Sequence, residues 1–320
     1  MTEDVDAVYT WVDGSDPAFQ ADFRRHASAA SADRELWHYR SNEELRFSLR
    51  SLFRFALWIR RIHILTNGQA PSWLDCSHPR IHLVTHAEIF PDPECLPTFN
   101  SNAIEMYLHR IPGLSRRFLY FNDDVFLGRS VRMSDFFQKG GGQTIFLEGL
   151  PVPLNWVQGS MRDRACAHTQ NVLNELWGQP PAPRLLPAHT PQAYDRDVLS
   201  RLEAMVPKEF RQTASHRFRA WNDLVLSVLY AYSLRESAAE QCGHELQVLH
   251  NPSPQYGFLM LSRKWPGAMY AYFNMLRTRP KFFCINDDLG EVPAHHPLLL
   301  SIRTFLRLYF RKPAPVERTP

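Results

Sequence analysis

The chain has 320 residues, is 44% hydrophobic and 22% charged, and carries a formal net charge of +3. This length and hydrophobic content suffice for a sizeable core in one large or two modest domains. The near-balanced charge excludes the dense basic surface typical of nucleic-acid-binding proteins. The five cysteines are scattered without a CxxC spacing, which argues against a disulfide framework or a thiolate zinc site and favours a reducing compartment. The start MTEDVDAVYT predicts no signal peptide and no apolar run is long enough to span a membrane, so we expect a cytoplasmic protein.

Strands and helices alternate in the first half of the chain. Residues 6–12 are β-branched and aromatic and predict a strand that the turn DGSD closes. A helix over 41–57 begins with Ser41 and has Glu44 three positions later, which is typical of a capping box. Short strands are predicted at 61–67, 80–86 and 117–124, and a helix begins near residue 100. The alternation predicts an α/β fold with a mostly parallel central sheet flanked by helices.

The second half is predicted to be more helical. The proline-rich residues 179–192 predict a flexible surface loop. Helices are predicted over 193–206 and 220–234, a strand over 281–287 and a last helix over 297–312. We therefore expect one main domain over residues 1–292, followed by a basic amphipathic helix and tail over 293–320.

Polar residues stand where several predicted strands end. They are Asp13, Asp16, Asn67, Asn122 to Asp124, and Asn286 to Asp288. In open α/β sheets, ligands lie at the carboxyl ends of the strands, so parallel neighbours would bring these carboxylates and amides to one edge. Oxygen ligands of this kind suit Mg²⁺ or Mn²⁺, and such a cation commonly holds a phosphate or diphosphate. The alternative is turn chemistry, because Asp and Asn also hydrogen-bond their own backbone after strands.

Several longer stretches resemble the conserved regions of the Stealth family. They are VYTWVDGSDP, NEELRFSLRSLFRFALWIRRIHILTNGQAPSWL, LPTFNSNAIEMYLHRIPGLSRRFLYFNDDVFLG, TPQAYDRDVLSRLEAMVPKEF with SHRFRAWNDL, and FFCINDD. The match runs from Val5 to Leu289 in the family's order. The family includes bacterial capsule polymerases that transfer hexose-1-phosphate and the catalytic core of the lysosomal-enzyme GlcNAc-1-phosphotransferase. This chain lacks the large inserted modules of the animal enzyme, which favours a bacterial glycan acceptor.

The resemblance implies a nucleotide-sugar transferase architecture, GT-A-like or Rossmann-like, with a helical C-terminal part. It also implies that a UDP-sugar donates sugar-1-phosphate to a glycan hydroxyl and that UMP is released. Phosphoryl transfer of this kind requires mainly positioning and charge stabilisation. By the resemblance, Asp16 and Asp124 are expected to be catalytic. Asp124, Asn286 and Asp287 are expected to hold Mg²⁺ (or Mn²⁺), and Asp13 and Asp123 to contact the substrate.

Two histidines are candidates for the general base. His216 matches the histidine of the family's third region, and we expect it to take the proton of the acceptor hydroxyl. Arg219, three residues later, is expected to bind phosphate oxygens. His189 is the alternative base, although a loop histidine beside prolines is commonly just exposed.

Further substrate contacts are expected from Arg46, Asn67, Asn100, Asn102 and Asn222. The alternatives are a solvated helix face for Arg46 and helix capping for the asparagines at helix starts. Helix capping is also the default interpretation of Asp223, which opens the last of these helices together with Asn222.

Two rival functions stay open. A metal-dependent nucleotide-sugar glycosyltransferase would use the same carboxylates but would cleave the sugar C–O bond and release UDP. A non-catalytic glycan-binding protein is the other rival, although the acidic positions are intact. The pair His216 and Arg219 favours the sugar-1-phosphate transferase.

The C-terminal segment 297–312 has two interpretations. Arg303, Arg307 and Arg311 recur every fourth residue, and apolar residues cover much of the rest of the helix. Such a helix can lie on an anionic membrane, which would place the protein at the inner membrane face. The alternative is a terminal helix that docks its apolar side on the core.

Overall fold

The computed structural model describes residues 4–27, 36–154, 157–178, 183–236, 243–262 and 265–318. A central sheet runs in the order β3 (Ile81–Thr85), β2 (Ile62–Thr66), β1 (Val5–Thr10), β4 (Arg117–Asn122) and β8 (Gln192–Asp195). The first four strands are parallel, and β8 is antiparallel to β4. The predicted mostly parallel central sheet is therefore confirmed.

The innermost strands are buried along almost their whole length. Every residue of β2 is buried, as are the first five residues of β1. Strands that helices cover on both faces read as continuous apolar runs, and these sequences do so. Asp6 is a charged exception, and its fully buried carboxylate accepts hydrogen bonds from Arg60 at 2.8 and 2.6 Å and from the backbone of Ser115 at 2.8 Å.

Two smaller sheets adjoin the central one. One contains β10 (Tyr256–Leu261), β11 (Phe282–Asp287) and β5 (Val125–Leu127), with β10 and β11 parallel and β5 antiparallel to β11. The other contains β7 (Leu185–Pro187), β6 (Thr144–Pro151) and β9 (Glu245–Leu249). The chain passes from the central sheet to the β10–β11–β5 sheet at Asp123 and Asp124, which join β4 to β5. The two aspartates therefore lie where two sheets meet.

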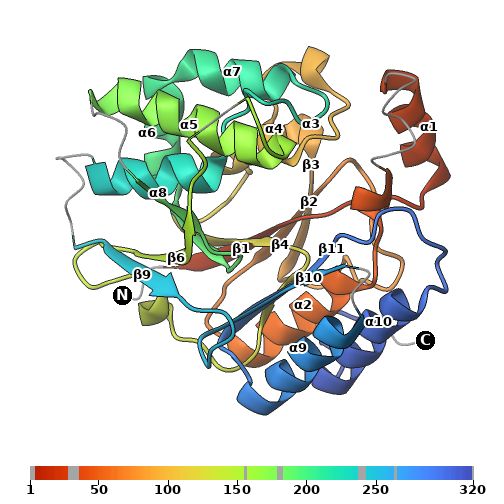
Figure 1. The fold of residues 1–320 in the computed structure, drawn as a ribbon. Helices are drawn as coiled ribbons and strands as arrows, with labels where there is room; N and C mark the ends of the chain where they lie inside the picture. Colours follow the sequence, from red (N-terminus) through yellow and green to blue (C-terminus); the bar gives the residue numbers. More distant parts are fainter. Residues whose placement is uncertain are drawn as a thin grey trace.

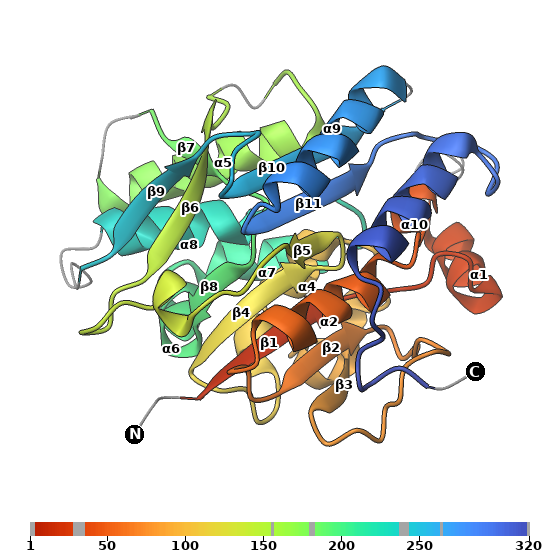
Figure 2. The ribbon, with the colours of Figure 1, turned by 90° about the horizontal axis from the view of Figure 1, so that it is seen from below.

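Helices form a layer on each side of the sheets (Figure 1). One layer contains α3 (His86–Ile89), α4 (Ser101–Glu105), α5 (Met161–Trp177), α6 (Arg196–Met205), α7 (Pro207–Ser215) and α8 (Leu226–Glu236). The other contains α2 (Glu44–Phe55), α9 (Trp265–Thr278) and α10 (Pro297–Tyr309), which lie together in Figure 2. Helix α1 (Pro17–His26) lies to one side, and short 3₁₀ helices occur at η1 (Leu36–Tyr39), η2 (Pro93–Cys95), η3 (Leu108–Arg110) and η4 (Met133–Asp135).

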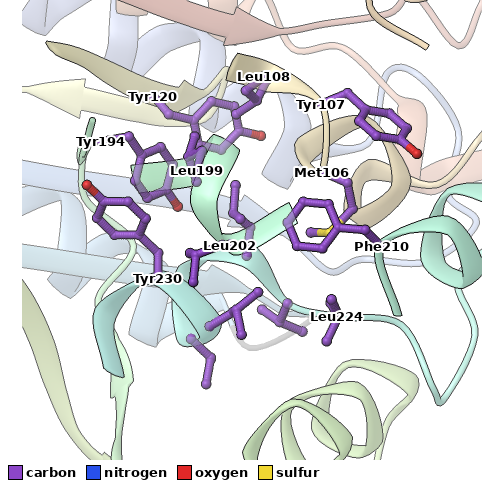
Figure 3. Close-up of a cluster of buried hydrophobic side chains, with 14 of the residues drawn as sticks. Met106, Tyr107, Leu108, Tyr120, Tyr194, Leu199, Leu202, Phe210, Leu224 and Tyr230 are labelled. Atoms are coloured by element: carbon purple, nitrogen blue, oxygen red, sulfur yellow. The ribbon is translucent and has the colours of Figure 1, made fainter. Parts of the chain in front are cut away.

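The core between the sheet and the first helix layer is rich in tyrosine (Figure 3). The ring of Tyr194 in β8 packs against Tyr230 of α8 at 4.7 Å and against Tyr120 of β4 at 6.2 Å. The hydroxyl of Tyr230 accepts a hydrogen bond from the backbone of Asp195 at 2.8 Å. This contact joins α8 to the edge of the central sheet.

Helix α2 is attached to β5 by two serines on its buried face. Ser48 donates to the backbone carbonyl of Val125 at 2.5 Å, and Ser51 accepts from the backbone of Leu127 at 3.1 Å. Glu44 lies one turn before Ser48 on the same face, so it is directed toward the turn between β4 and β5.

The predicted capping box of this helix is wrong. The helix begins at Glu44, after Glu43 in the left-handed conformation with φ of 69°. The carboxylate of Glu44 is bonded instead to the backbone and side chain of Asn42. The helix therefore begins three residues later than the local pattern predicted.

The predicted loop over 179–192 is also wrong in its second part. Residues 179–182 lie outside the described residues. Leu185–Pro187 form β7, which pairs antiparallel with β6, and Ala188 and Thr190 are buried. Pairing with β6 satisfies the backbone of this proline-rich stretch, so it does not run over the surface.

Helix α10 docks on the core, as the second interpretation expected. Leu299, Ile302 and Leu306 are fully buried, and the ring of Phe305 stacks on Tyr272 of α9 at 4.7 Å. The apolar side that a membrane would require is therefore covered by protein. Among the described helices, none combines the length and hydrophobicity needed to cross a bilayer.

Candidate active site

A cavity of about 230 Å³ opens at the carboxyl edge of the central sheet. Part of its lining comes from strand ends: the end of β1, the β4–β5 turn and the end of β11. Another part comes from the segment around η1, the start of α2, the start of α3 and the segment before α4. The residues are Thr10, Trp11, Val12, Phe19, Trp37, His38, Tyr39, Arg40, Glu44, His86, Thr98, Phe99, Ser101, Ile104, Asn122, Asp123, Asp124, Arg219, Ile285, Asn286 and Asp287. The two Asn-Asp-Asp stretches of the sequence thus meet at one cavity, as expected, but not as parallel neighbours of one sheet, because β4 and β11 belong to different sheets.

Three acidic side chains gather at one side of this cavity. Burial raises the pKa of Asp123 well above its ordinary value, and the nearby carboxyl groups of Glu44 and Asp124 raise it further. Burial likewise raises the pKa of Glu44 to about 7, with a contribution from Asp124. Like charges that share a buried site resist ionising together. The cluster is therefore poised to accept a positive charge.

Asp124 has the most specific surroundings of the three. One carboxylate oxygen, Oδ2, accepts from the side-chain amide of Asn286 at 3.3 Å and lies 3.3 Å from the thiol of Cys284. The other, Oδ1, is buried and has no hydrogen-bond partner among the described residues. Burial raises the pKa of this carboxyl group, and the nearby His189 acts in the opposite direction. An unpartnered buried carboxylate oxygen is costly unless a ligand or cation contacts it.

The structure gives Asp287 a different partner from the predicted cation. Arg40 donates to its two carboxylate oxygens at 2.8 and 3.0 Å, and Asn42 donates to it at 3.2 Å. Arg40 also donates to the carbonyl of Gly290 at 3.1 Å, which ties the segment before α2 to the end of β11. A bidentate arginine already neutralises Asp287. Asp287 is thus paired with Arg40 in this arrangement, and a metal site shared by Asp287 and Asp124 stays a prediction.

His216 is held by a carboxylate that the sequence interpretation treated as a helix cap. Its Nδ1 lies 2.7 Å from Oδ1 of Asp223, which is fully buried. The side-chain amides of Asn100 and Asn102 donate to Oδ2 of Asp223 at 2.8 and 3.2 Å. Both asparagines therefore position the His216–Asp223 pair, and Asn100 additionally caps α4 through the backbone of Asn102.

Arg219 reaches the cavity, whereas His216 is not part of its lining. One guanidinium nitrogen of Arg219 donates to the hydroxyl of Ser101 at 2.9 Å. Burial lowers the pKa of His38, and the positive charge of Arg219 lowers it further. A cationic side chain thus lines the same cavity as the acidic cluster.

His189 lies near Asp124 at the end of β7. Its Nδ1 is 3.0 Å from Glu148, which also accepts from the hydroxyl of Tyr256 at 3.1 Å. Among the groups that lower the pKa of Asp124, His189 has the largest effect, although it does not itself line the cavity. It is therefore a second histidine held by a carboxylate.

The remaining predicted residues lie outside the cavity lining. Asp16 caps α1 by accepting from the backbone of Phe19 at 2.9 Å, and Asp13 accepts from Ser15 at 2.9 and 2.6 Å. The turn interpretation accounts for both of these contacts.

Asn67 is exposed at the end of β2, and Asn222 is partly exposed in the turn before α8. Arg46 donates to Glu317 at 2.6 Å on the outer side of α2. Its expected contact with a diphosphate is therefore replaced by an ion pair.

Sequence reasoning missed the roles of Asn42, Glu44 and Asp223. For Glu44 a signal was present, because Glu44, Ser48 and Ser51 share the buried helix face on which the leucines also lie. Polar residues on an apolar face indicate buried hydrogen bonds or a site.

The residues present fit a divalent cation at the acidic cluster. Over the described parts of the chain, no group of three or more Asp, Glu, His or Cys side chains forms a ready metal cage. Mg²⁺ does not need one, since it commonly takes one or two carboxylates and completes its shell with water and substrate phosphates. The unpartnered Oδ1 of Asp124 and the raised pKa of Asp123 are what such an ion would relieve.

Sequence-family comparisons match the elements that build this cavity. Residues 3–25 match Stealth protein conserved region 1, residues 38–145 match conserved region 2, and residues 188–234 match conserved region 3. Together the matches cover more than half of the chain. This chain belongs to the Stealth family. The predicted family is confirmed on these three regions, and the stretch FFCINDD stays a resemblance.

Curated Stealth relatives carry the name exopolysaccharide phosphotransferase. One from Streptomyces coelicolor is 39% identical over 98% of this chain and 52% of its own length. Exopolysaccharide phosphotransferase CpsY of Mycobacterium tuberculosis is 36% identical over 98% of this chain and 58% of its own length. The chain spans about half the length of these relatives.

Solved structures similar to this Stealth chain include galactosyltransferase LgtC in complex with donor and acceptor sugar analogs. The TM-score is 0.44 at 10% identity, covering 98% of this chain and 97% of LgtC. Mouse xyloside xylosyltransferase 1 has a TM-score of 0.41 at 14% identity, covering 91% of this chain and all of that one.

Proposed function

We propose that this Stealth-family chain transfers hexose- or N-acetylhexosamine-1-phosphate from a UDP-sugar to a hydroxyl of a glycan acceptor. The observation that carries the proposal is one cavity that Glu44, Asp123, Asp124 and Arg219 line together. An acidic cluster that needs a cation, together with an arginine, suits a diphosphate and its divalent ion. The names of the curated relatives support the phosphotransferase class.

The proposed step is a displacement at the β-phosphorus of the donor. The acceptor oxygen forms a bond to that phosphorus while the bond to the bridging oxygen breaks, and UMP leaves with the bridging oxygen. The acceptor proton passes to a base, and the product is a phosphodiester. The sugar C–O bond is untouched, so the anomeric configuration is retained.

Mg²⁺ (or Mn²⁺) is proposed to bind at Asp124, with Asp123 beside it and the amide oxygen of Asn286 as a further candidate ligand. When bound, such an ion neutralises charge on the diphosphate and on the departing UMP. Glu44 contributes negative charge next to these ligands, and Arg219 supplies phosphate contacts in the same cavity. The pair of Arg40 and Asp287 holds the end of β11 in place.

His189 is the base that we propose for the acceptor proton. The choice is supported by two observations: His189 is near enough to Asp124 to lower the pKa of that carboxyl group, and its bond with Glu148 fixes the ring. We assign His216 a positioning role instead, because its bond with Asp223 orders the segment that carries Arg219. This assignment reverses the order that the sequence resemblance favoured.

Identification of the released nucleotide tests the proposal. The protein is incubated with Mg²⁺, a panel of UDP-sugars and oligosaccharide acceptors, and the products are separated by anion-exchange chromatography. We expect acceptor-dependent release of UMP. Release of UDP would instead establish the glycosyltransferase rival, and donor binding without turnover across the panel would support the glycan-binding one.

A further inference from the structure

One end of the cavity carries a histidine that the proposed chemistry does not use. His86 is the first residue of α3, directly after β3, and it lines the cavity while being only 4% exposed. Its Nε2 is buried and has no hydrogen-bond partner within the described ranges of the chain. Burial lowers the pKa of His86 to about 4, so the imidazole is neutral at pH 7 and has one nitrogen that donates and one that accepts.

The cavity that His86 lines also has apolar and aromatic side chains in its wall. Trp11, Phe99 and Ile104 line the same cavity and are 8%, 6% and 7% exposed. The ring of Phe99 is fixed from behind by Phe218, stacked at 5.2 Å, and by Phe23, edge-on at 5.2 Å. A rigid apolar slot with one unpaired polar atom suits a flat heteroaromatic ring that offers a hydrogen bond at its edge.

The spacing of the strands sets the distance between this slot and the acidic cluster. His86 follows β3 and Asp123 follows β4, and these strands are separated by β2 and β1 in the sheet. Adjacent strands are about 4.8 Å apart, so the two ends of the cavity lie roughly 14 Å from one another. A ligand that reaches both ends is elongated, with a flat ring at one end and a charged group at the other. A nucleoside diphosphate has this form.

We propose that the His86 end of the cavity binds the uracil ring of the donor, with Nε2 of His86 hydrogen-bonded to the base edge. The inference rests on the proposed function, and it fixes the direction in which the donor lies. The base is at β3, the ribose crosses the end of β1, and the diphosphate reaches Asp123, Asp124 and Arg219. His86 would then select a nucleotide by its base without touching the reacting phosphorus.

Calorimetric binding of UMP and of ribose 5-phosphate, which lacks the base, tests this assignment. We expect His86→Ala to weaken UMP about tenfold, the effect of one hydrogen bond, and to leave ribose 5-phosphate unchanged. His86→Gln, which retains a hydrogen-bonding group at the same reach, is expected to recover part of the loss. His250→Ala is the matched control, because His250 is an exposed histidine after β9.

The outcomes separate this inference from the function on which it rests. If UMP binds the wild type and His86→Ala equally well, the base lies elsewhere and only this inference falls. An equal loss for both ligands would make His86 a structural support of the cavity and would also overturn the inference. Failure of the wild type to bind any uridine nucleotide would overturn both. If His86→Ala does not fold, the binding of N3-methyl-UMP to the wild-type protein is measured instead, because the methyl group blocks the edge of the base. Binding of that analogue as tight as that of UMP would refute contact at the base edge.

Discussion

Glu44→Gln tests whether the negative charge of the buried Glu44 carboxylate lowers the stability of the fold. Glu44 accepts hydrogen bonds from the backbone and the side-chain amide of Asn42, and its carboxyl group lies near Asp124. Glutamine has nearly the same shape and no charge. It retains one accepting oxygen and loses one hydrogen bond from Asn42.

The expected change in stability has opposite components. The pKa of Glu44 rises from an ordinary value of 4.5 to about 7 in the folded state. The folded protein therefore holds a proton that the unfolded chain has released, and the free energy of unfolding falls between pH 4.5 and 7 and stays low above that. At 1.36 kcal/mol for each unit, the penalty above pH 7 is about 3 kcal/mol. Loss of one hydrogen bond costs about 1 kcal/mol. The variant should therefore be about 2 kcal/mol more stable than the wild type at pH 8, with no advantage at pH 4.5.

Urea unfolding of wild type and variant at the two pH values measures this difference. Glu291→Gln is the matched control, because Glu291 is exposed and lies outside the cluster. A stability difference that is the same at pH 4.5 and at pH 8 would refute the reasoning, since the effect arises only from the extra proton. Added Mg²⁺ with UMP is expected to reduce the difference in the free energy of unfolding between wild type and variant at pH 8, because the bound cation stabilises the ionised Glu44 of the wild type.

Three further predictions concern the proposed reaction and the fold. Asp124→Asn should lower sugar-phosphate transfer at least about a hundredfold without lowering the melting temperature, because it removes only a buried charge; retention of activity would remove this carboxylate from the cation site. His189→Ala should lower kcat about a hundredfold with little change in donor KM, and His216→Ala should act mainly on donor KM, in assays of UMP release. The reverse pattern would return the role of base to His216. Deletion of residues 297–320 should give aggregated protein without a cooperative melting transition, because α10 is part of the core, and a soluble, cooperatively folded product would contradict that packing.

The sequence was sufficient for the parts of the fold that follow local rules. Strands that are covered on both faces, such as IHILT and RFLYFN, consist mostly of apolar residues. These runs could therefore be predicted as strands of a mostly parallel sheet. The meeting of Asn122–Asp124 with Asn286–Asp287 was expected, but its cause was not, because β4 and β11 end at one cavity from two different sheets.

The partners of individual side chains could not be predicted in the same way. Asp287 looked like a ligand until Arg40, more than 200 positions away in the chain, occupied both of its oxygens. Asp223 looked like a helix cap from its position in the sequence. Its bonds to His216 and Asn100 depend on how α4 and α7 pack. These contacts join distant segments, and no local pattern encodes them.

The ion pairs on the outer side of α2 have a practical consequence. Glu317 is almost fully buried and accepts from Arg46 at 2.6 Å and from Arg50 at 2.6 and 2.7 Å, while the adjacent backbone pairs with Trp73 and Asp75. The same helix presents Glu44 to the cavity at its first turn. A purification handle attached close to Glu317 is therefore expected to disturb these ion pairs and, through α2, the position of Glu44. A handle ahead of β1 leaves the ion pairs intact, and we expect the protein tagged there to be the more active of the two.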